Sequence, residues 1–236
     1  MSNRLRHLAP ESLPVVLQSA SHQRPEVREA VMSVLGAVES PEGDVRAALL
    51  AGIEDPDYQV QMAALGTVRQ LKSDKEFALP AVTAALGRAA FPGMGVQEIV
   101  QAHALLTLAE IGGAARDSLP VVRTAAAQGA SAFVRVAAAR ALWRIGRDPT
   151  ESFPRLKAEF DDYDPHMKWM ILECFREMGT NAASAIDQVR AYVAEPDTDM
   201  STDPNFLHPG LEALHAMEGS HRPPAAELQA VPLPPE

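Results

Sequence analysis

The residues of this chain best suited to chemistry are its two tryptophans and the arginines beside them. Trp143 stands between Arg140 and Arg144, and Trp169 is followed by Arg176. Tryptophan offers a large contact area and arginine offers several hydrogen bonds, so both are enriched among the residues that dominate protein–protein binding. If these side chains face solvent, they predict a surface that binds another protein. The sequence leaves open whether the tryptophans are exposed or packed between neighbouring elements.

A second candidate for partner contact is the segment AAFPGMG, residues 89–95. It places Phe91 and Met94 beside glycines and a proline, which is typical of an exposed turn, and such turns often carry function. The alternative is that Phe91 folds back over the neighbouring surface. Both interpretations stay open at this point.

The acidic segment EPDTDMSTD, residues 195–203, superficially resembles a calcium-binding loop because its acids alternate with other residues. Calcium loops of that type need a glycine at the sixth position and a glutamate at the twelfth. Thr202 and His208 occupy these positions here. We therefore predict no metal site, and we interpret these acids as helix caps and a solvated rim.

The sequence contains none of the common catalytic motifs. G-x-S-x-G, the phosphate-binding P-loop, H-E-x-x-H and G-x-G-x-x-G are all missing. His103 and Cys174 lie far apart and have no evident third partner. A cysteine that borders an apolar stripe is typically buried and unreactive. We predict a protein that is not an enzyme and holds no cofactor.

The charge balance limits the class of partner. The chain carries 21 Lys and Arg against 31 Asp and Glu, a formal net charge of -10. Clustered positive charge is what binds phosphate backbones, so this balance argues against nucleic acid and for solubility. The first residues lack the apolar core of a signal peptide, and no run reaches the ~18 apolar residues of a membrane span. We expect a soluble, cytoplasmic protein that does not contact a membrane.

The elements that position the tryptophans and arginines are copies of one repeat. In VRVAAARALWRIG, residues 134–146, apolar side chains occupy offsets 0, 4, 8 and 11 from the first residue. On a helix these offsets form one stripe, so offsets 2, 6, 9 and 10 should face away from it. The tryptophans and their arginines occupy these off-stripe offsets. The copies begin at Val27, Val60, Val100, Val134, Met167 and Phe206.

A first helix is predicted before every copy, because similar strings recur there, most with a proline near the start. They are LPVV 13–16, RAAL 46–49, LPAV 79–82, LPVV 119–122, FPRL 153–156 and IDQV 186–189. Gly112, Gly146 and Gly179 follow offset 11, where glycine commonly ends a helix. The sequence thus predicts an all-α protein of about six antiparallel helix pairs over residues 1–219. The proline-rich tail, residues 220–236, is predicted to be mostly disordered.

The repeat string V-R-x-x-A-A-x-A-L-x-x-I-G resembles the HEAT-repeat family of helical solenoids. The residues that carry the resemblance best are Val134, Arg135, Ala138, Ala139, Leu142, Ile145 and Gly146. The spacing of 33 or 34 residues is similar to the short bacterial variety rather than to the usual period of ~40–47. The resemblance implies a right-handed superhelix whose second helices line a concave side that holds other proteins. It also implies that an arginine at offset 1, such as Arg28, bonds an aspartate of the neighbouring repeat.

The family also contains enzymes, and two kinds are disfavoured here. Deoxyhypusine hydroxylase requires His-Glu dipeptides, and none of the 7 histidines precedes a glutamate. The DNA glycosylases of the family need a basic groove, which a net charge of -10 does not encourage. Phycobilin lyases leave no short motif to check, so a phycobilin-lyase-like enzyme or cofactor-holding protein stays as the alternative. We predict a non-enzymatic scaffold or adaptor that contacts a protein partner through Arg140, Trp143, Arg144, Trp169 and Arg176, with Phe91 and Met94 as accessories.

Overall fold

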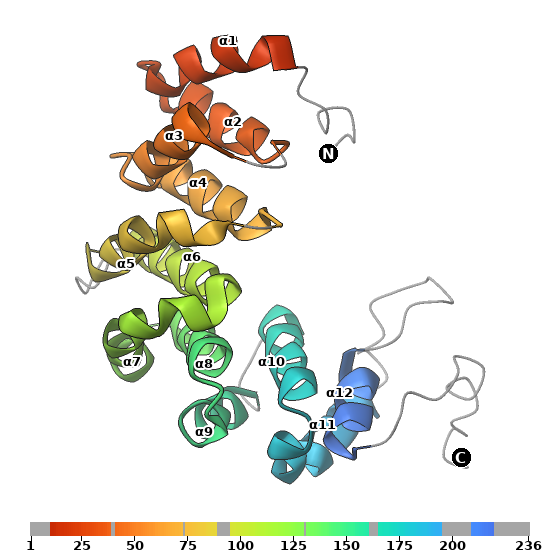
Figure 1. Ribbon diagram of the computed structural model, residues 1–236. Coiled ribbons are helices and arrows are strands. Elements are labelled where there is room, and N and C mark those ends of the chain that lie inside the picture. Colours follow the sequence, from red (N-terminus) through yellow and green to blue (C-terminus); the bar gives the residue numbers. More distant parts are fainter. Residues whose placement is uncertain are drawn as a thin grey trace. The chain divides into compact units, whose positions relative to one another are not determined.

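The computed structural model describes residues 10–38, 41–72, 74–88, 95–129, 131–160, 165–194 and 209–219. The regular elements within these ranges are α-helices and 3-10 helices, and none of the ranges contains a strand (Figure 1). This confirms the all-α class. Phe91, Met94, the acidic segment 195–203 and the tail 220–236 lie outside the described residues.

The chain divides into two compact units, Met1–Asp148 and Pro149–Glu236. The structure establishes the architecture of each unit separately. A continuous solenoid over residues 1–219, its handedness and its number of helix pairs therefore stay predictions.

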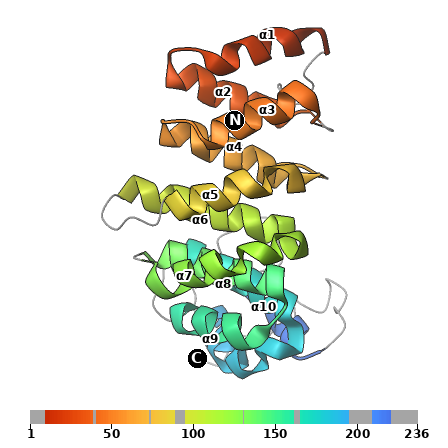
Figure 2. The ribbon, with the colours of Figure 1, turned by 60° about the vertical axis from the view of Figure 1, so that its left-hand side comes forward.

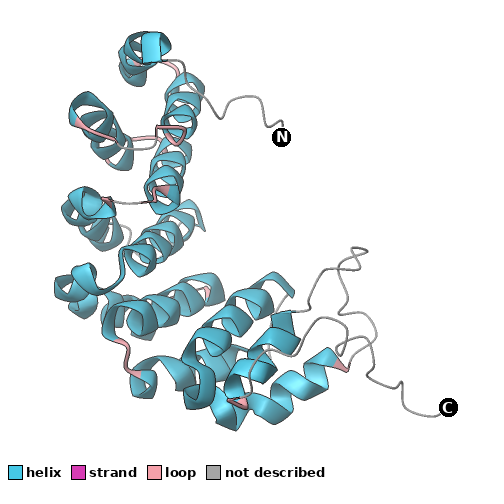
Figure 3. Cartoon of the chain, turned by 45° about the vertical axis from the view of Figure 1, so that its right-hand side comes forward, coloured by secondary structure: helices cyan, strands magenta, loops and turns pink. Residues whose placement is uncertain are grey.

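In the first unit the helices alternate between two layers (Figures 2 and 3). The first layer holds α1 (Leu13–Gln18), α3 (Gly43–Ile53), α5 (Leu79–Arg88) and α7 (Leu119–Gln128), which are the predicted first helices. The second-helix layer holds the copies of the stripe, α2 (Pro25–Leu35), α4 (Tyr58–Gln70), α6 (Gly95–Ile111) and α8 (Ala132–Gly146). The short 3-10 segment η2 (Pro10–Ser12) precedes α1, and the segments η3 (Ser19–Ser21), η4 (Lys75–Ala78) and η5 (Gly112–Ser118) connect successive helices. Each second helix packs against the next one, so their off-stripe side chains become neighbours in space.

Helix α4 shows why the sequence folds into these layers. Val60, Ala64 and Val68, at offsets 0, 4 and 8, are each 0% exposed. Burying a valine side chain contributes about 1.5–3 kcal/mol relative to leaving it in water. Asp57 caps the start of the helix, because its carboxylate accepts a hydrogen bond from the Gln59 backbone N–H at 2.9 Å. The predicted stripe is thus the buried face of the helix.

The predicted glycine helix ends are confirmed at two of three positions. Gly112 and Gly179 have φ of 70° and 57°, in the left-handed region that favours glycine. Gly146 stays helical instead, and Arg147 takes the left-handed conformation at φ 57°. The Arg147 backbone N–H donates to the Trp143 carbonyl at 2.8 Å, and its guanidinium lies 5.2 Å from the Trp143 ring centroid. These two contacts offset the cost of about 1–2 kcal/mol that a non-glycine residue meets in this conformation.

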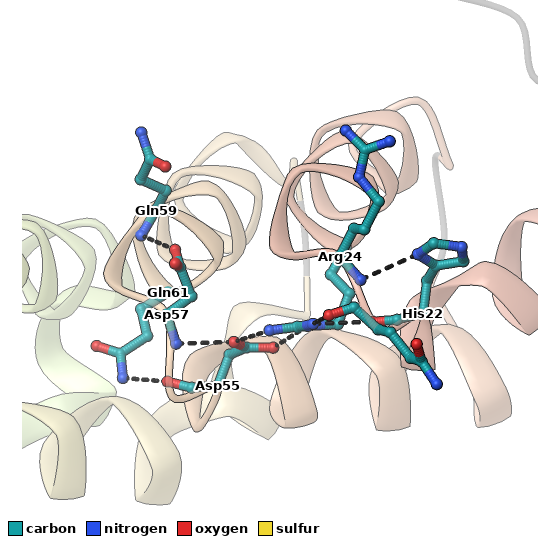
Figure 4. A network of polar contacts seen from close by, with 8 residues as sticks. His22, Arg24, Asp55, Asp57, Gln59 and Gln61 are labelled. Carbon is teal, nitrogen blue, oxygen red and sulfur yellow. Dashed lines mark hydrogen bonds and ion pairs between the residues drawn. The ribbon is translucent and has the colours of Figure 1, made fainter.

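Polar side chains join the first repeat to the second at the turn before α4 (Figure 4). Arg28 donates from Nε and Nη2 to the two carboxylate oxygens of Asp55, at 2.7 and 2.8 Å. Arg28 Nη1 also donates to the His22 and Gln23 carbonyls, at 2.8 and 3.1 Å. Gln61 Nε2 donates to the Asp55 carbonyl at 2.5 Å. The expectation that an arginine at offset 1 bonds an aspartate of the neighbouring repeat is confirmed here.

This network makes the carboxyl of Asp55 more acidic. Burial alone would raise its pKa, but hydrogen bonds from the Arg28 guanidinium and the Asp57 backbone N–H, with the charge of Arg28, hold the pKa below the ordinary 3.8. Because the folded-state pKa is lower than the unfolded one, the contribution to stability is complete above about pH 3.8 and is lost as pH falls through the folded value.

We expect Asp55→Ala to lower the free energy of unfolding at neutral pH by about 1–3 kcal/mol, because the Asp57 N–H and the Arg28 guanidinium lose a shared acceptor. Urea unfolding followed by circular dichroism measures this difference. The gap between the two proteins should narrow as the pH is lowered through the acid range, since the wild-type carboxylate then becomes protonated. Asp117→Ala, on exposed η5, is the matched control. A gap that stays constant down to strongly acidic pH would contradict the expectation.

Two buried threonines also tie successive second helices together, and the sequence pattern did not predict them. Thr67 Oγ1 donates to the Met32 carbonyl at 2.8 Å. The Thr107 hydroxyl is shared between the His103 carbonyl of its own helix, at 2.8 Å, and the Leu65 carbonyl of α4, at 3.2 Å. The threonines are 5% and 0% exposed. In both cases offset 7 of one copy bonds offset 5 of the copy before it. The contact therefore recurs at equivalent positions of two successive pairs of repeats.

The second unit contains α9 (Pro149–Phe160), α10 (Pro165–Met178), η6 (Gly179–Ala185), α11 (Ile186–Val193) and α12 (Pro209–Met217). Its core centres on Phe175, which is 0% exposed and lies 5.6 Å from Phe153 and 5.8 Å from Phe160 between ring centroids. Helix α9 already begins at Pro149, so Pro154 lies inside the helix rather than near its start as the FPRL string predicted.

Candidate functional site

The side of α8 that carries the predicted contact residues is largely buried. Arg140 is 9% and Trp143 is 5% exposed, and the side chain of Arg144 is 22% exposed. Of the two possibilities that the sequence left open for Trp143, packing between neighbouring elements therefore holds on this helix. The reason is that α6 packs beside α8, where Glu110 pairs with both arginines. Their binding to a partner stays a prediction.

Glu110 of α6 is the acid around which these arginines gather. Its Oε1 lies 2.7 Å from Arg144 Nη1 and 3.5 Å from Arg140 Nη2. The side chains of Glu110, Arg144 and Arg140 are 27%, 22% and 11% exposed. Partial shielding from water strengthens the attraction between such charges. The Glu110 carboxylate thus forms ion pairs with the guanidinium groups of both Arg140 and Arg144.

A third arginine comes from α4. Arg69 is half-buried, and its guanidinium makes no hydrogen bond or ion pair with any residue that the structure describes. Burial lowers the pKa of Arg69, the charge of Glu110 opposes this effect and the charge of Arg140 adds to it. The charges of Arg69 on α4, Glu110 on α6 and Arg140 on α8 thus influence one another. Together we call Arg69, Glu110, Arg140 and Arg144 the arginine cluster.

Two buried nitrogen atoms beside the arginine cluster lack a hydrogen-bond partner among the described residues. They are Nδ1 of His103, on α6, and Nε1 of Trp143, on α8. Burial lowers the pKa of His103 and the charge of Arg69 lowers it further, so the neutral ring is favoured. Buried polar atoms in folded proteins nearly always have a partner. Both atoms are therefore exceptions to this rule, and a ligand reaches either one only after a movement of the side chains that cover it.

The second unit carries the other two predicted contact residues on α10. Trp169 is 53% exposed, so it is one of the large apolar side chains open to solvent. Arg176 Nε lies 3.8 Å from Glu212 Oε2, and these side chains are 45% and 35% exposed. The structure thus places three predicted residues on α8 and two on α10, in different units. Trp143 is buried and Trp169 is exposed, which answers the question that the sequence left open.

Three residues of this region are not among those predicted from the sequence. Arg69 and Glu110 occupy offsets 9 and 10, the same offsets as Trp143 and Arg144. Comparing the off-stripe positions across all copies would therefore have found them. His103 lies at offset 3, outside those positions, and has no such signal.

Among the described residues no three His, Cys, Asp or Glu side chains gather as metal ligands do, and no described helix is long and apolar enough to cross a membrane. A cavity of about 180 Å³ is lined by Tyr58 and Gln61 of α4 and by Val96 and Val100 of α6. It lies at the N-terminal ends of these helices, whereas the arginine cluster lies toward their C-terminal ends.

Alternating helix layers, a recurring apolar stripe and bonds between successive repeats define a helical-repeat protein. Residues 13–92 match the family model of HEAT repeats, which confirms the resemblance to that family over this part of the chain. No curated protein matches the sequence.

Several solved structures resemble this chain, among them the following two. One is the complex of CpcE and CpcF of phycocyanin lyase from Nostoc sp. PCC7120, with 18% identity, 91% of this chain and 84% of that chain covered, and a TM-score of 0.59. The other is an engineered protein, with 16% identity, 92% of this chain and 98% of that chain covered, and a TM-score of 0.49. At this level of identity, the first likeness shows the helical-repeat fold alone.

Proposed function

We propose that this protein is a non-enzymatic scaffold or adaptor that holds a partner protein on its second-helix layer. The observation that carries the proposal is the arginine cluster, to which α4, α6 and α8 each contribute. Charges are costly to bury, and a stack already held by apolar stripes does not need them for its stability. Arginines gathered beside a tryptophan are instead well suited to binding a protein.

The bonds between repeats support the same proposal. The Arg28–Asp55 pair and the hydroxyls of Thr67 and Thr107 link successive repeats at fixed points. A surface that is rigid before binding loses less conformational entropy when the partner docks. Each repeat of such an array contacts mainly its neighbours, so each added repeat extends the surface along the array. A preformed layer of this kind is what a scaffold uses.

In the second unit we propose Trp169 and Arg176 as contacts. Trp169 exposes 53% of its surface, an area that a partner would cover. The side chain of Arg176 is 45% exposed beside Glu212, so its guanidinium can donate hydrogen bonds to a partner protein. Arg140, Trp143 and Arg144 are the proposed contacts of the first unit.

We expect Trp169→Ala to weaken partner binding by about tenfold or more, because exposed tryptophans are frequent binding hot spots. Chemical cross-linking in cells of the native source identifies the partner. Calorimetry with the two purified proteins then measures the affinity.

Val15→Ala, an exposed apolar position on α1 at 66% exposure, is the control and should bind as the wild type does. Failure to form a stable complex with any protein, or unchanged affinity of Trp169→Ala, would count against the proposal.

The alternative is that the second-helix layer holds a pigment or cofactor, as in a lyase-type protein. It is favoured by the fold likeness to a structure of phycocyanin lyase. Adding a free bilin to the purified protein and recording the visible absorption spectrum tests it. A saturable spectral shift would support the alternative, and an unchanged spectrum would leave the scaffold as the function to pursue.

A further inference from the structure

We propose that Arg69 is the centre of a site that binds one carboxylate of an acidic peptide segment of the partner protein. The proposal rests on the scaffold function and names the chemistry that its second-helix layer recognises. It assigns the site to α4, α6 and α8, all within the first unit.

The first observation is that Arg69 differs from the other described arginines of the second helices. Arg28 pairs with Asp55, Arg140 and Arg144 share Glu110, Arg176 lies beside Glu212, and Arg135 donates to the Gly129 carbonyl. Arg69 is half-buried and has neither an ion pair nor a hydrogen bond from its guanidinium to any described residue. A partly buried charge without a partner is unfavourable. A carboxylate from outside the chain would supply the missing acceptor.

The second observation is that further hydrogen-bonding groups lie in the same region. Nε1 of Trp143 is a buried N–H without an acceptor, and Nδ1 of His103 is a buried nitrogen without a partner. Arg69 and Trp143 occupy the same offset on α4 and α8, with Ala109 at that offset on the intervening α6. Arg69 and Trp143 thus come from the two second helices that pack on either side of α6.

Charge selects the class of ligand. The planar guanidinium matches a carboxylate with two parallel hydrogen bonds. Glu110 in the same cluster repels a second negative charge, and the whole chain carries a net charge of -10. Polyanions such as nucleic acid gain affinity from many cationic contacts, which this surface does not offer. A single acidic side chain in a largely uncharged peptide fits these conditions better.

The site is tested with a defined probe and the full-length protein. The probe is the blocked peptide Gly-Leu-Glu-Leu-Gly, compared with Gly-Leu-Gln-Leu-Gly and with inorganic phosphate, by isothermal titration calorimetry. We expect saturable binding of the glutamate peptide and no heat from the glutamine peptide. Equal binding of the glutamine peptide would overturn the proposal. Binding of phosphate in preference to the glutamate peptide would overturn it as well, since the site would then be a phosphate site.

Arg69→Met is the decisive variant, because methionine is unbranched and about as long as the aliphatic part of arginine, and it removes the charge. We expect it to bind the glutamate peptide at least about tenfold more weakly, since hydrogen bonds to charged groups are strong. Its melting temperature should equal or exceed that of the wild type, because an unpaired charge has been removed. Arg116→Met, on exposed η5, should leave both quantities unchanged.

Each remaining outcome decides against one of the two proposals. A lower melting temperature together with unchanged peptide affinity would make Arg69 a structural residue and overturn the site. A partner complex whose affinity is unaffected by Arg69→Met would also overturn the site while leaving the scaffold in place. Peptide binding lost in Arg69→Met, without any partner complex, would retain the site and remove the scaffold.

Discussion

Phe175→Ala should lower the free energy of unfolding of the second unit by about 3–5 kcal/mol. The ring is 0% exposed and lies within 5.8 Å of the ring centroids of Phe153 and Phe160. Truncation removes apolar contact with both rings and leaves a cavity that the surrounding structure fills only in part. Few other single substitutions in this unit remove as much buried apolar surface.

Hydrogen exchange measured by mass spectrometry locates this effect along the chain. Exchange should rise in the helices that follow Pro149, with little change in those that precede Asp148, because the two units are compact separately. Val96→Ala, at a position that is 40% exposed, is the control and should change little. An equal rise in both units would show that they unfold as one.

Gly52→Val should lower the free energy of unfolding of the first unit by about 3 kcal/mol, the upper end of the usual range for an overpacked core. A Cβ at Gly52 would lie 2.3 Å from Met32 Sδ and 2.9 Å from the Ala64 Cβ. Met32 is 1% exposed and Ala64 is 0% exposed, so neither has free space to move into. Helices α2, α3 and α4 approach closely at this glycine, and a larger residue must separate them.

Gly66→Val is the matched control for this prediction. Gly66 also lies inside a helix, but a Cβ there meets nothing within 4 Å. Because valine and glycine differ little in helix propensity, the control should be nearly neutral. Urea unfolding of both variants gives the comparison. Similar losses at the two glycines would mean that crowding at Gly52 is not the cause.

The helices could be predicted from the sequence because their burial follows a local period. Val60, Ala64 and Val68 recur at the spacing of a helix face, and that spacing alone places the buried side. The Arg28–Asp55 pair could be expected as well, from the family that the repeat resembles. These features depend on the repeat and its nearest neighbour only.

The candidate site could be predicted only in part, because it depends on which helices lie side by side. The period places Trp143 away from the stripe of its own helix, yet the ring is 5% exposed. Arg69 and Glu110 come from other helices, and only packing brings their charges into one field. Helical periodicity describes one helix at a time, so it does not show what covers the far side. Trp169 has the same kind of off-stripe position and does remain open.

The threonine hydroxyls of α4 and α6 have a mechanical consequence. The Thr67 hydroxyl fixes one point of α4 to the backbone of α2 at 2.8 Å. The Thr107 hydroxyl, shared with the His103 carbonyl of its own helix, makes a longer contact of 3.2 Å from α6 to α4. Sliding one helix along the next by a single residue would break that bond, whereas a small rotation about it would not. The first unit should therefore resist sliding of one second helix along the next more strongly than a small change in the angle between them. The order and spacing of the second helices are thus held before a partner docks, and only the angle between neighbouring helices adjusts.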